Sequence, residues 1–233
     1  MRELCNYILV TSLLLVGVPA VPGAQTIADT RLRLNAGVSY EPVKKLELTG
    51  RYRLTTHQGG TEFLRSMFSL RASYKIARGW EAGAEYRYNT SYQQDYHRYF
   101  VFTRVKYGID KFDISYRLRY QQDQDYFDAE YLEAYPAERV LRNRLMVKYA
   151  YNKKCDVYTY ADHFSELEDG GLSPFRVRYG AGVQYLYKKR HDISLEFFIN
   201  DGFNRKRPQN VAAIDVSYTY LLSKKSKKKK KKN

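Results

Sequence analysis

Apolar and polar residues alternate along almost the whole chain, and this period of two constrains the fold more than any other feature of the sequence. Ten runs of about ten residues follow it, which is the length that a tilted strand needs to cross an outer membrane. One face of these runs has 53 positions and no charged residue, although a composition with 28% charged residues would place about 15 charges there by chance. The chain is therefore built of long strands with one charge-free and one charged face.

The runs can be placed by residue number. They cover 32–40, 46–54, 64–74, 80–88, 99–107, 112–120, 141–149, 175–187, 193–199 and 212–222. In each run the charge-free face consists of the first residue and every second residue after it. An eleventh segment, 156–164, follows the period less clearly; because an aspartate facing lipid would be costly, Asp162 is placed on the charged face with Tyr158 and Tyr160. Eleven antiparallel segments would leave the chain ends on opposite sides, whereas bacterial barrels have even strand numbers. The sequence therefore predicts ten to twelve strands.

Alternation alone does not decide which face is inside, because a soluble barrel would turn the charge-free face toward an apolar cavity. Three features favour the inverse arrangement: the runs exceed the five or six residues usual in soluble strands, aromatic residues gather at the strand ends, and the connections alternate between short and long. The predicted aromatic girdle contains Tyr40, Tyr74, Trp80, Tyr107, Tyr149, Tyr187 and Tyr220. The predicted fold class is an all-β, transmembrane, antiparallel up-and-down β-barrel.

The connections predict the orientation of this barrel. The short ones, which would face the periplasm, are 41–45, 76–79, 108–111, 152–155 and 188–191. The long ones, which would face the cell exterior, are 56–62, 90–95, 122–138, 165–174 and 201–210. The third long connection is rich in aspartate and glutamate, which predicts a solvated surface loop, with an inward-folded gate or a divalent-cation site as alternatives.

Both ends of the chain differ from this pattern. Residues 1–24 have a charged start, an apolar run and small residues up to Ala24, which predicts a secretory signal peptide cleaved there or after Ala20. Residues 25–222 would form the barrel, and the lysine-rich residues 223–233 would form a disordered tail or contact anionic envelope polymers. Export through a leader and a barrel fold predict an outer-membrane location, with lipids and the barrel-assembly machinery as partners.

The repeated segments LTGRYRL, AGAEYRY, ISYRLRY and VRYGAGVQY, together with the closing IDVSYTYLL, resemble a family of Gram-negative outer-membrane barrels catalogued as a domain of unknown function. The likeness would cover residues 25–222. It implies the barrel fold, and it carries no catalytic residues over to this chain. The lysine tail departs from the pattern, because in that family the end of the last strand closes the chain.

The charged face carries eighteen Arg and Lys residues and six Asp and Glu residues, so the predicted interior is positive. The proposed basic lining is Arg51, Arg53, Arg65, Arg71, Arg87, Arg104, Arg117, Arg119, Arg142, Arg144, Arg176 and Arg178. Its proposed acidic partners are Glu47, Glu85, Asp113, Glu196 and Asp215. A narrow bore with these walls would concentrate small anionic solutes, whereas a fully paired set of charges would plug it as a structural barrel.

Other functions have weaker support in the sequence. The net charge of +15 includes eight tail lysines, and no nucleic-acid recognition motif is visible. Cys155 is the only cysteine outside the leader, so no disulfide, metal site or cofactor is predicted. A surface-loop hydrolase using Asp162, His163 and Ser165 is one alternative, but neighbours in a strand point to opposite faces. No catalytic residue and no enzyme activity are therefore predicted; the other alternative is a secreted soluble barrel binding an apolar ligand.

Overall fold

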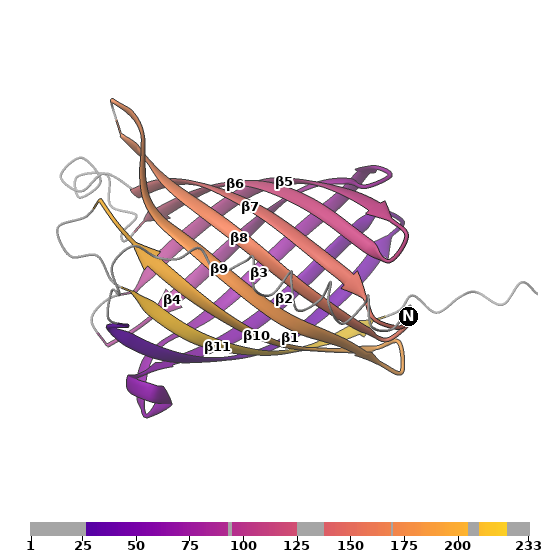
Figure 1. Ribbon diagram of the computed structural model, residues 1–233, viewed down its shortest axis with the longest axis horizontal. Coiled ribbons are helices and arrows are strands. Elements are labelled where there is room, and N and C mark those ends of the chain that lie inside the picture. The colour runs from indigo at the N-terminus through magenta and orange to yellow at the C-terminus, as the bar shows by residue number, and fades with distance from the viewer. Residues whose placement is uncertain (1–26, 93–94, 125–137, 169, 205–209, 223–233) are drawn as a thin grey trace, which may run out of the picture.

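The computed structural model describes residues 27–92, 95–124, 138–168, 170–204 and 210–222, and in these ranges the chain forms a closed barrel of eleven strands (Figure 1). A single 3-10 turn, η1 (Gln58–Gly60), follows the second strand. The strands are β1 (Asp29–Val43), β2 (Leu46–His57), β3 (Glu62–Ala77), β4 (Trp80–Thr90), β5 (Tyr96–Ile109), β6 (Phe112–Gln124), β7 (Glu138–Ala150), β8 (Cys155–Glu168), β9 (Gly171–Tyr187), β10 (His191–Gly202) and β11 (Val211–Leu222).

Each strand pairs with its neighbours in the sequence, and β1 pairs with β11 to close the ring. The ten sequential pairs are antiparallel, and the closing pair is parallel, in a register that runs from Asp29 beside Val211 to Tyr40 beside Leu222. The parallel closure follows from the odd number, because the first and eleventh strands of an alternating series run in the same direction. The barrel class and the count of eleven segments are thus confirmed, and the two ends of the barrel chain lie on opposite sides, as eleven alternating segments require.

The charge-free face of the strands forms the outer surface of the barrel. Leu70, Leu145 and Leu195 are each more than half exposed, and most large apolar residues of the predicted phase are exposed with them. A soluble barrel would bury this face, so the apolar belt supports the transmembrane assignment. Among the described residues, no helix is long and apolar enough to cross a membrane.

The connections differ at the two ends of the barrel, with tight turns at the right of Figure 1 and the longer connections at the left. The prediction of a long loop over 165–174 is wrong, because β8 and β9 continue as a paired hairpin up to Glu168 and Gly171. This hairpin extends past the neighbouring strands in Figure 1. The predicted signal peptide, the lysine tail and the centre of the acidic loop 122–138 lie outside the described residues.

A β-bulge changes the face of one predicted outward residue. Phe164 is opposite Arg176, while Ser165 is opposite Pro174, so Phe175 is an extra residue in β9. Phe175 is therefore buried, with its ring centroid 6.2 Å from that of Phe164, and its predicted outward position was wrong. One inserted residue reverses the phase of the alternation. The reversal was missed because the predicted run begins at Phe175, at the bulge itself.

Inward-facing glycines allow aromatic rings to lie flat against the barrel wall. Tyr160 is paired with Gly180 across β8 and β9, and a Cβ atom added to Gly180 would lie only 2.5 Å from the Tyr160 ring. The same relation links Phe102 to Gly83 on β5 and β4, where the added atom would lie 2.7 Å from the ring. These glycines let large side chains occupy a narrow interior without blocking it.

We therefore expect Gly180→Val to lower the free energy of unfolding by about 1 to 3 kcal/mol, because the Tyr160 ring would have to leave its place on the wall. Urea unfolding in detergent micelles, followed by circular dichroism, measures this change. Ala181→Val is the control, since Ala181 is the next residue of β9 and lies on the outward face. Equal losses in the two variants would contradict the proposed packing.

Candidate functional site: a charged cavity inside the barrel

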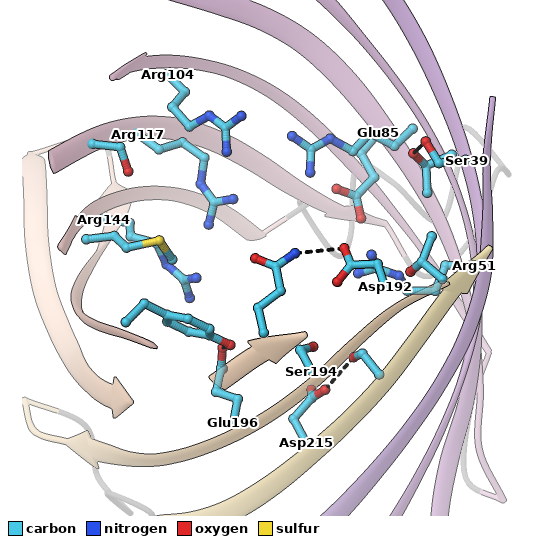
Figure 2. Close-up of a pocket in the computed structure, with 18 of the residues that line it drawn as sticks. Ser39, Arg51, Glu85, Arg104, Arg117, Arg144, Asp192, Ser194, Glu196 and Asp215 are labelled. Atoms are coloured by element: carbon cyan, nitrogen blue, oxygen red, sulfur yellow. Dashed lines mark hydrogen bonds between the residues drawn. The ribbon is translucent and has the colours of Figure 1, made fainter. Parts of the chain in front are cut away.

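A cavity of about 520 Å³ lies inside the barrel, and its wall is mostly charged (Figure 2). Thirteen basic residues and six acidic residues line it, which leaves an excess of seven positive charges at neutral pH. The basic residues are Arg33, Arg51, Arg53, Arg71, Arg87, Arg104, Lys106, Arg117, Arg119, Arg142, Arg144, Lys148 and Arg178. The acidic residues are Glu47, Glu85, Asp113, Asp192, Glu196 and Asp215. Side chains from all eleven strands contribute, so the cavity is a property of the whole barrel.

The structure places most of the sequence-predicted lining residues in this wall. Ten of the twelve arginines line the cavity, and so do all five acidic partners, Glu47, Glu85, Asp113, Glu196 and Asp215. The two exceptions are Arg65 and Arg176, which lie in the barrel half with the long connections. Arg65 donates a hydrogen bond of 2.8 Å to the Tyr96 hydroxyl, and Arg176 stacks on the Phe164 ring at 4.2 Å.

Carboxylates bind arginines within and between strands, which cross-links the inner wall. Asp162 on β8 has a fully buried side chain and accepts hydrogen bonds from Arg142 Nη2 at 2.5 Å and Arg144 Nε at 2.7 Å, both on the neighbouring β7. Glu85 accepts from Arg87 on its own strand, β4, at 2.5 Å and lies 3.4 Å from Arg119 on β6, two strands away.

A second such group links Glu81 on β4 to Arg104 at 2.8 Å and to Arg71 at 3.5 Å. Near the short turns, Lys106 lies 2.7 Å from Asp113, and Ser39 donates a hydrogen bond of 2.9 Å to Glu47. The carboxylates of Glu81 and Asp113 compensate charge on the basic face, whereas the partner of Glu47 is the neutral Ser39. The wall is therefore partly neutralised, and its free charge resides in fewer residues than the sequence count indicates.

The carboxylates on β10 and β11 have mainly neutral partners. Both oxygens of Glu196 accept hydrogen bonds from tyrosine hydroxyls, at 2.6 Å from Tyr160 and 3.0 Å from Tyr158. Asp215 accepts from Asn35 at 2.7 Å and lies 3.6 Å from Arg53. The inward placement of Asp162, Tyr158 and Tyr160, which the weak alternation left open, is thus what the structure shows.

Four arginines of the cavity wall have no carboxylate partner in the described part of the chain. No carboxylate oxygen of the described residues lies within 4.0 Å of Arg33, Arg51, Arg117 or Arg178, although paired arginines surround them. Arg51 and Arg117 are labelled in Figure 2, where both point into the cavity from different sides. Uncompensated positive charge in a narrow, low-dielectric space attracts anions strongly.

Four inward-facing phenylalanines were not predicted. Phe100, Phe102, Phe164 and Phe198 share the inner face with the charged residues and are at most 5% exposed. They were overlooked because only the charged residues of that face were assigned. A large aromatic residue in the same phase as the charges could have indicated them, and Phe102 also pairs with a glycine in the neighbouring strand.

The predicted aromatic girdle lies at the strand ends beside the short turns. Tyr40, Tyr74, Trp80, Tyr107 and Tyr187 are exposed, and Tyr149 and Tyr220 are partly exposed. The Trp80 indole donates a hydrogen bond of 2.8 Å to Thr103 Oγ1 on the outer surface. Amphipathic rings in this position suit a membrane interface, where one side is apolar and the other is wet.

The residues of the hydrolase alternative do not form a relay. The Asp162 carboxylate is bonded to Arg142 and Arg144 inside the barrel, while His163 follows it on the opposite face of β8. Ser165 Oγ lies 3.4 Å from His163 Nδ1, and among the described residues no Asp or Glu forms a hydrogen bond or ion pair with this imidazole. Within the described ranges, no group of three His, Cys, Asp or Glu residues is placed to hold a metal ion.

Comparison with known proteins supports the architecture. No protein-family model and no curated protein matches the sequence, so the resemblance to a catalogued domain of unknown function has no support. Among solved structures, the NanC porin is similar with a TM-score of 0.54 and 13% identity, over 83% of this chain and 99% of that chain. The KdgM porin gives a TM-score of 0.47 and 12% identity, over 74% and 89% respectively. The likeness to NanC is one of fold, and this fold is a porin-like β-barrel.

Proposed function

We propose that this chain forms a narrow outer-membrane pore that prefers anions. The observation that carries the proposal is the cavity of about 520 Å³ whose wall has thirteen basic and six acidic residues, and in which Arg33, Arg51, Arg117 and Arg178 have no carboxylate partner among the residues that the structure describes. A transmembrane pore requires an apolar outer surface in contact with lipid and an interior lined by polar or charged side chains. The porin-like fold supports the outer-membrane location.

Recordings from planar bilayers test this proposal. With purified protein in a potassium chloride gradient, we expect a conductance whose reversal potential has the sign of chloride selectivity. The triple variant Arg33→Gln, Arg51→Gln and Arg117→Gln should lower the chloride-to-potassium permeability ratio by about twofold or more, because it removes three of the four arginine charges that have no carboxylate partner in the described part of the barrel. A cation-selective wild-type conductance would refute the anion preference.

Equal removal of charge outside the cavity provides the control. Arg78, Lys154 and Arg190 are exposed in three short turns and are absent from the cavity wall. Their triple glutamine variant carries the same change in net charge and should alter the permeability ratio less than the cavity variant. Similar effects of both variants would assign the selectivity to total charge at the mouth and not to the cavity.

A plugged structural barrel is the competing function, and the internal ion pairs of Glu81, Glu85 and Asp162 favour it. Such a barrel would insert into the bilayer and show no conductance. The pore proposal therefore fails if folded, membrane-inserted protein gives no ion-selective current.

A further inference from the structure

A second feature of the cavity wall is a set of arginines stacked on phenylalanine rings. Six arginines that line the cavity have the guanidinium carbon over such a ring: Arg71 over Phe102 at 4.4 Å, Arg87 and Arg119 over Phe100 at 4.4 and 4.6 Å, Arg142 over Phe164 at 4.9 Å, and Arg33 and Arg178 over Phe198 at 4.6 and 4.5 Å. Four of the six also bind carboxylates, and Arg33 and Arg178 have none within 4.0 Å among the described residues. We call these six the stacked arginines and the four rings the backing rings. They come from β1 and from β3 to β10, so the motif extends around most of the barrel.

The backing rings and the stacked arginines occupy different layers. All six stacked arginines line the cavity, whereas none of the four backing rings does. The rings are at most 5% exposed, and Phe198 is completely buried beside Tyr160 and Ala213. Each guanidinium group therefore lies between an aromatic ring and the space through which a solute would pass.

For two of the stacked arginines, Arg33 and Arg178, this arrangement leaves hydrogen-bond donors available to a solute. A ring contacts the flat face of the guanidinium and uses none of its N–H groups, whereas a carboxylate partner occupies some of them. Arg33 stacks on Phe198 and has no carboxylate within 4.0 Å among the described residues. Its neighbour on the same ring, Arg178, makes one hydrogen bond within the described ranges, from Nε to the Asn200 amide oxygen at 2.6 Å.

Stacking also limits the motion of a long side chain. A free arginine loses rotamer entropy when it binds a ligand, whereas one already held against a ring has lost part of that entropy in the folded barrel. A planar fork of N–H groups in a fixed place favours ligands with two oxygen atoms at matching positions, such as carboxylate, phosphate or sulfate, over a spherical ion such as chloride.

We propose that Phe198 is a positioning residue that holds Arg33 and Arg178 as a binding site for oxyanions inside the pore. The proposal rests on the proposed anion-preferring pore and adds both the ligand class and the residues that establish it. The ring acts through the two arginines and does not itself contact the solute. Chloride passes this site, whereas an oxyanion dwells at it and slows the chloride current.

The test is block of chloride current by sodium sulfate added to planar bilayers containing the full protein. In Phe198→Leu, we expect the sulfate concentration for half block to rise about three- to tenfold, because Arg33 and Arg178 lose their common ring. The conductance in chloride alone should remain close to that of wild type, which a general disruption of the barrel would not allow. Phe197→Leu is the matched control, since Phe197 is the adjacent residue and is half exposed on the outer face.

Phe100→Leu is the comparison variant, because Arg87 and Arg119 on that ring also bind Glu85, so its effect on block should be smaller. If Phe198→Leu fails to fold, Arg33→Gln and Arg178→Gln each remove one arginine of the site and should each raise the sulfate concentration for half block. The inference is overturned if Phe198→Leu keeps wild-type sulfate block, if Phe197→Leu or Phe100→Leu weakens block as much as Phe198→Leu, or if the two glutamine variants keep wild-type block. A wild-type barrel without anion preference would instead refute the proposed function, so the two failures are distinguishable.

Discussion

Replacing Asp162 by asparagine is expected to lower the free energy of unfolding by about 3 to 5 kcal/mol, the largest loss from any single substitution considered for the interior. The Asp162 side chain is fully buried and accepts hydrogen bonds from Arg142 at 2.5 Å and from Arg144 at 2.7 and 2.8 Å. Asparagine has nearly the same shape and no charge, so two buried guanidinium groups would lose their common counter-ion. Its amide nitrogen would also face an N–H donor.

Urea unfolding in lipid vesicles, followed by the fluorescence of the single tryptophan, Trp80, measures this loss. Asp156→Asn is the matched control: Asp156 lies on the same strand and pairs with Lys148 at 3.3 Å, but its side chain is one-third exposed. A pair that contacts water contributes about 0 to 1 kcal/mol. Similar losses for both variants would show that burial of the Asp162 group is not what stabilises the wall.

The strands and their faces could be predicted from the sequence because two strong physical constraints act on the same residues. A strand alternates its side chains between two faces, and hydrocarbon excludes charge from one of them, so Leu70 and Leu195 are outside while Arg71 and Glu196 are inside. The same constraint also gave the correct faces of β8, where the alternation was unclear, because an aspartate facing lipid would be costly and Asp162 was therefore placed inside. The same alternation delimited eleven segments, and the observed number of strands lies within the prediction of ten to twelve.

What the sequence did not reveal depends on contacts between strands. That Arg142 and Arg144 share Asp162, or that Arg33 stacks on Phe198 two strands away, depends on register, which a single strand does not carry. Phe175 was assigned to the wrong face because a bulge at the start of the predicted run reverses the phase there, and only the pairing with β8 reveals it. The division of arginines into paired and unpaired sets is likewise a property of the closed ring, and so is the parallel pair that closes it.

Leu195→Arg is expected to impair assembly and to lower the free energy of unfolding by about 2 to 4 kcal/mol, because it places a charge on the lipid face near the middle of the bilayer. Leu195 is 55% exposed and is paired with Val183 and Val216 on the neighbouring strands. Neither valine side chain could form a hydrogen bond or ion pair with the new guanidinium group. Urea titration with Trp80 fluorescence in vesicles gives the stability, and the folded fraction after dilution into vesicles gives the assembly yield.

Ser194→Arg on the same strand is the control that makes this result specific to one face. Ser194 lines the cavity between Gln184 and Ser217, where a long charged side chain can extend into water-accessible space. This variant should keep its stability within about 1 kcal/mol of wild type, because a surface polar replacement away from packed contacts usually has a small effect. Since adjacent residues of a strand differ only in the side to which they point, equal losses at 194 and 195 would mean that lipid does not contact the uncharged face. The inside of the barrel would then have been assigned to the wrong set of residues.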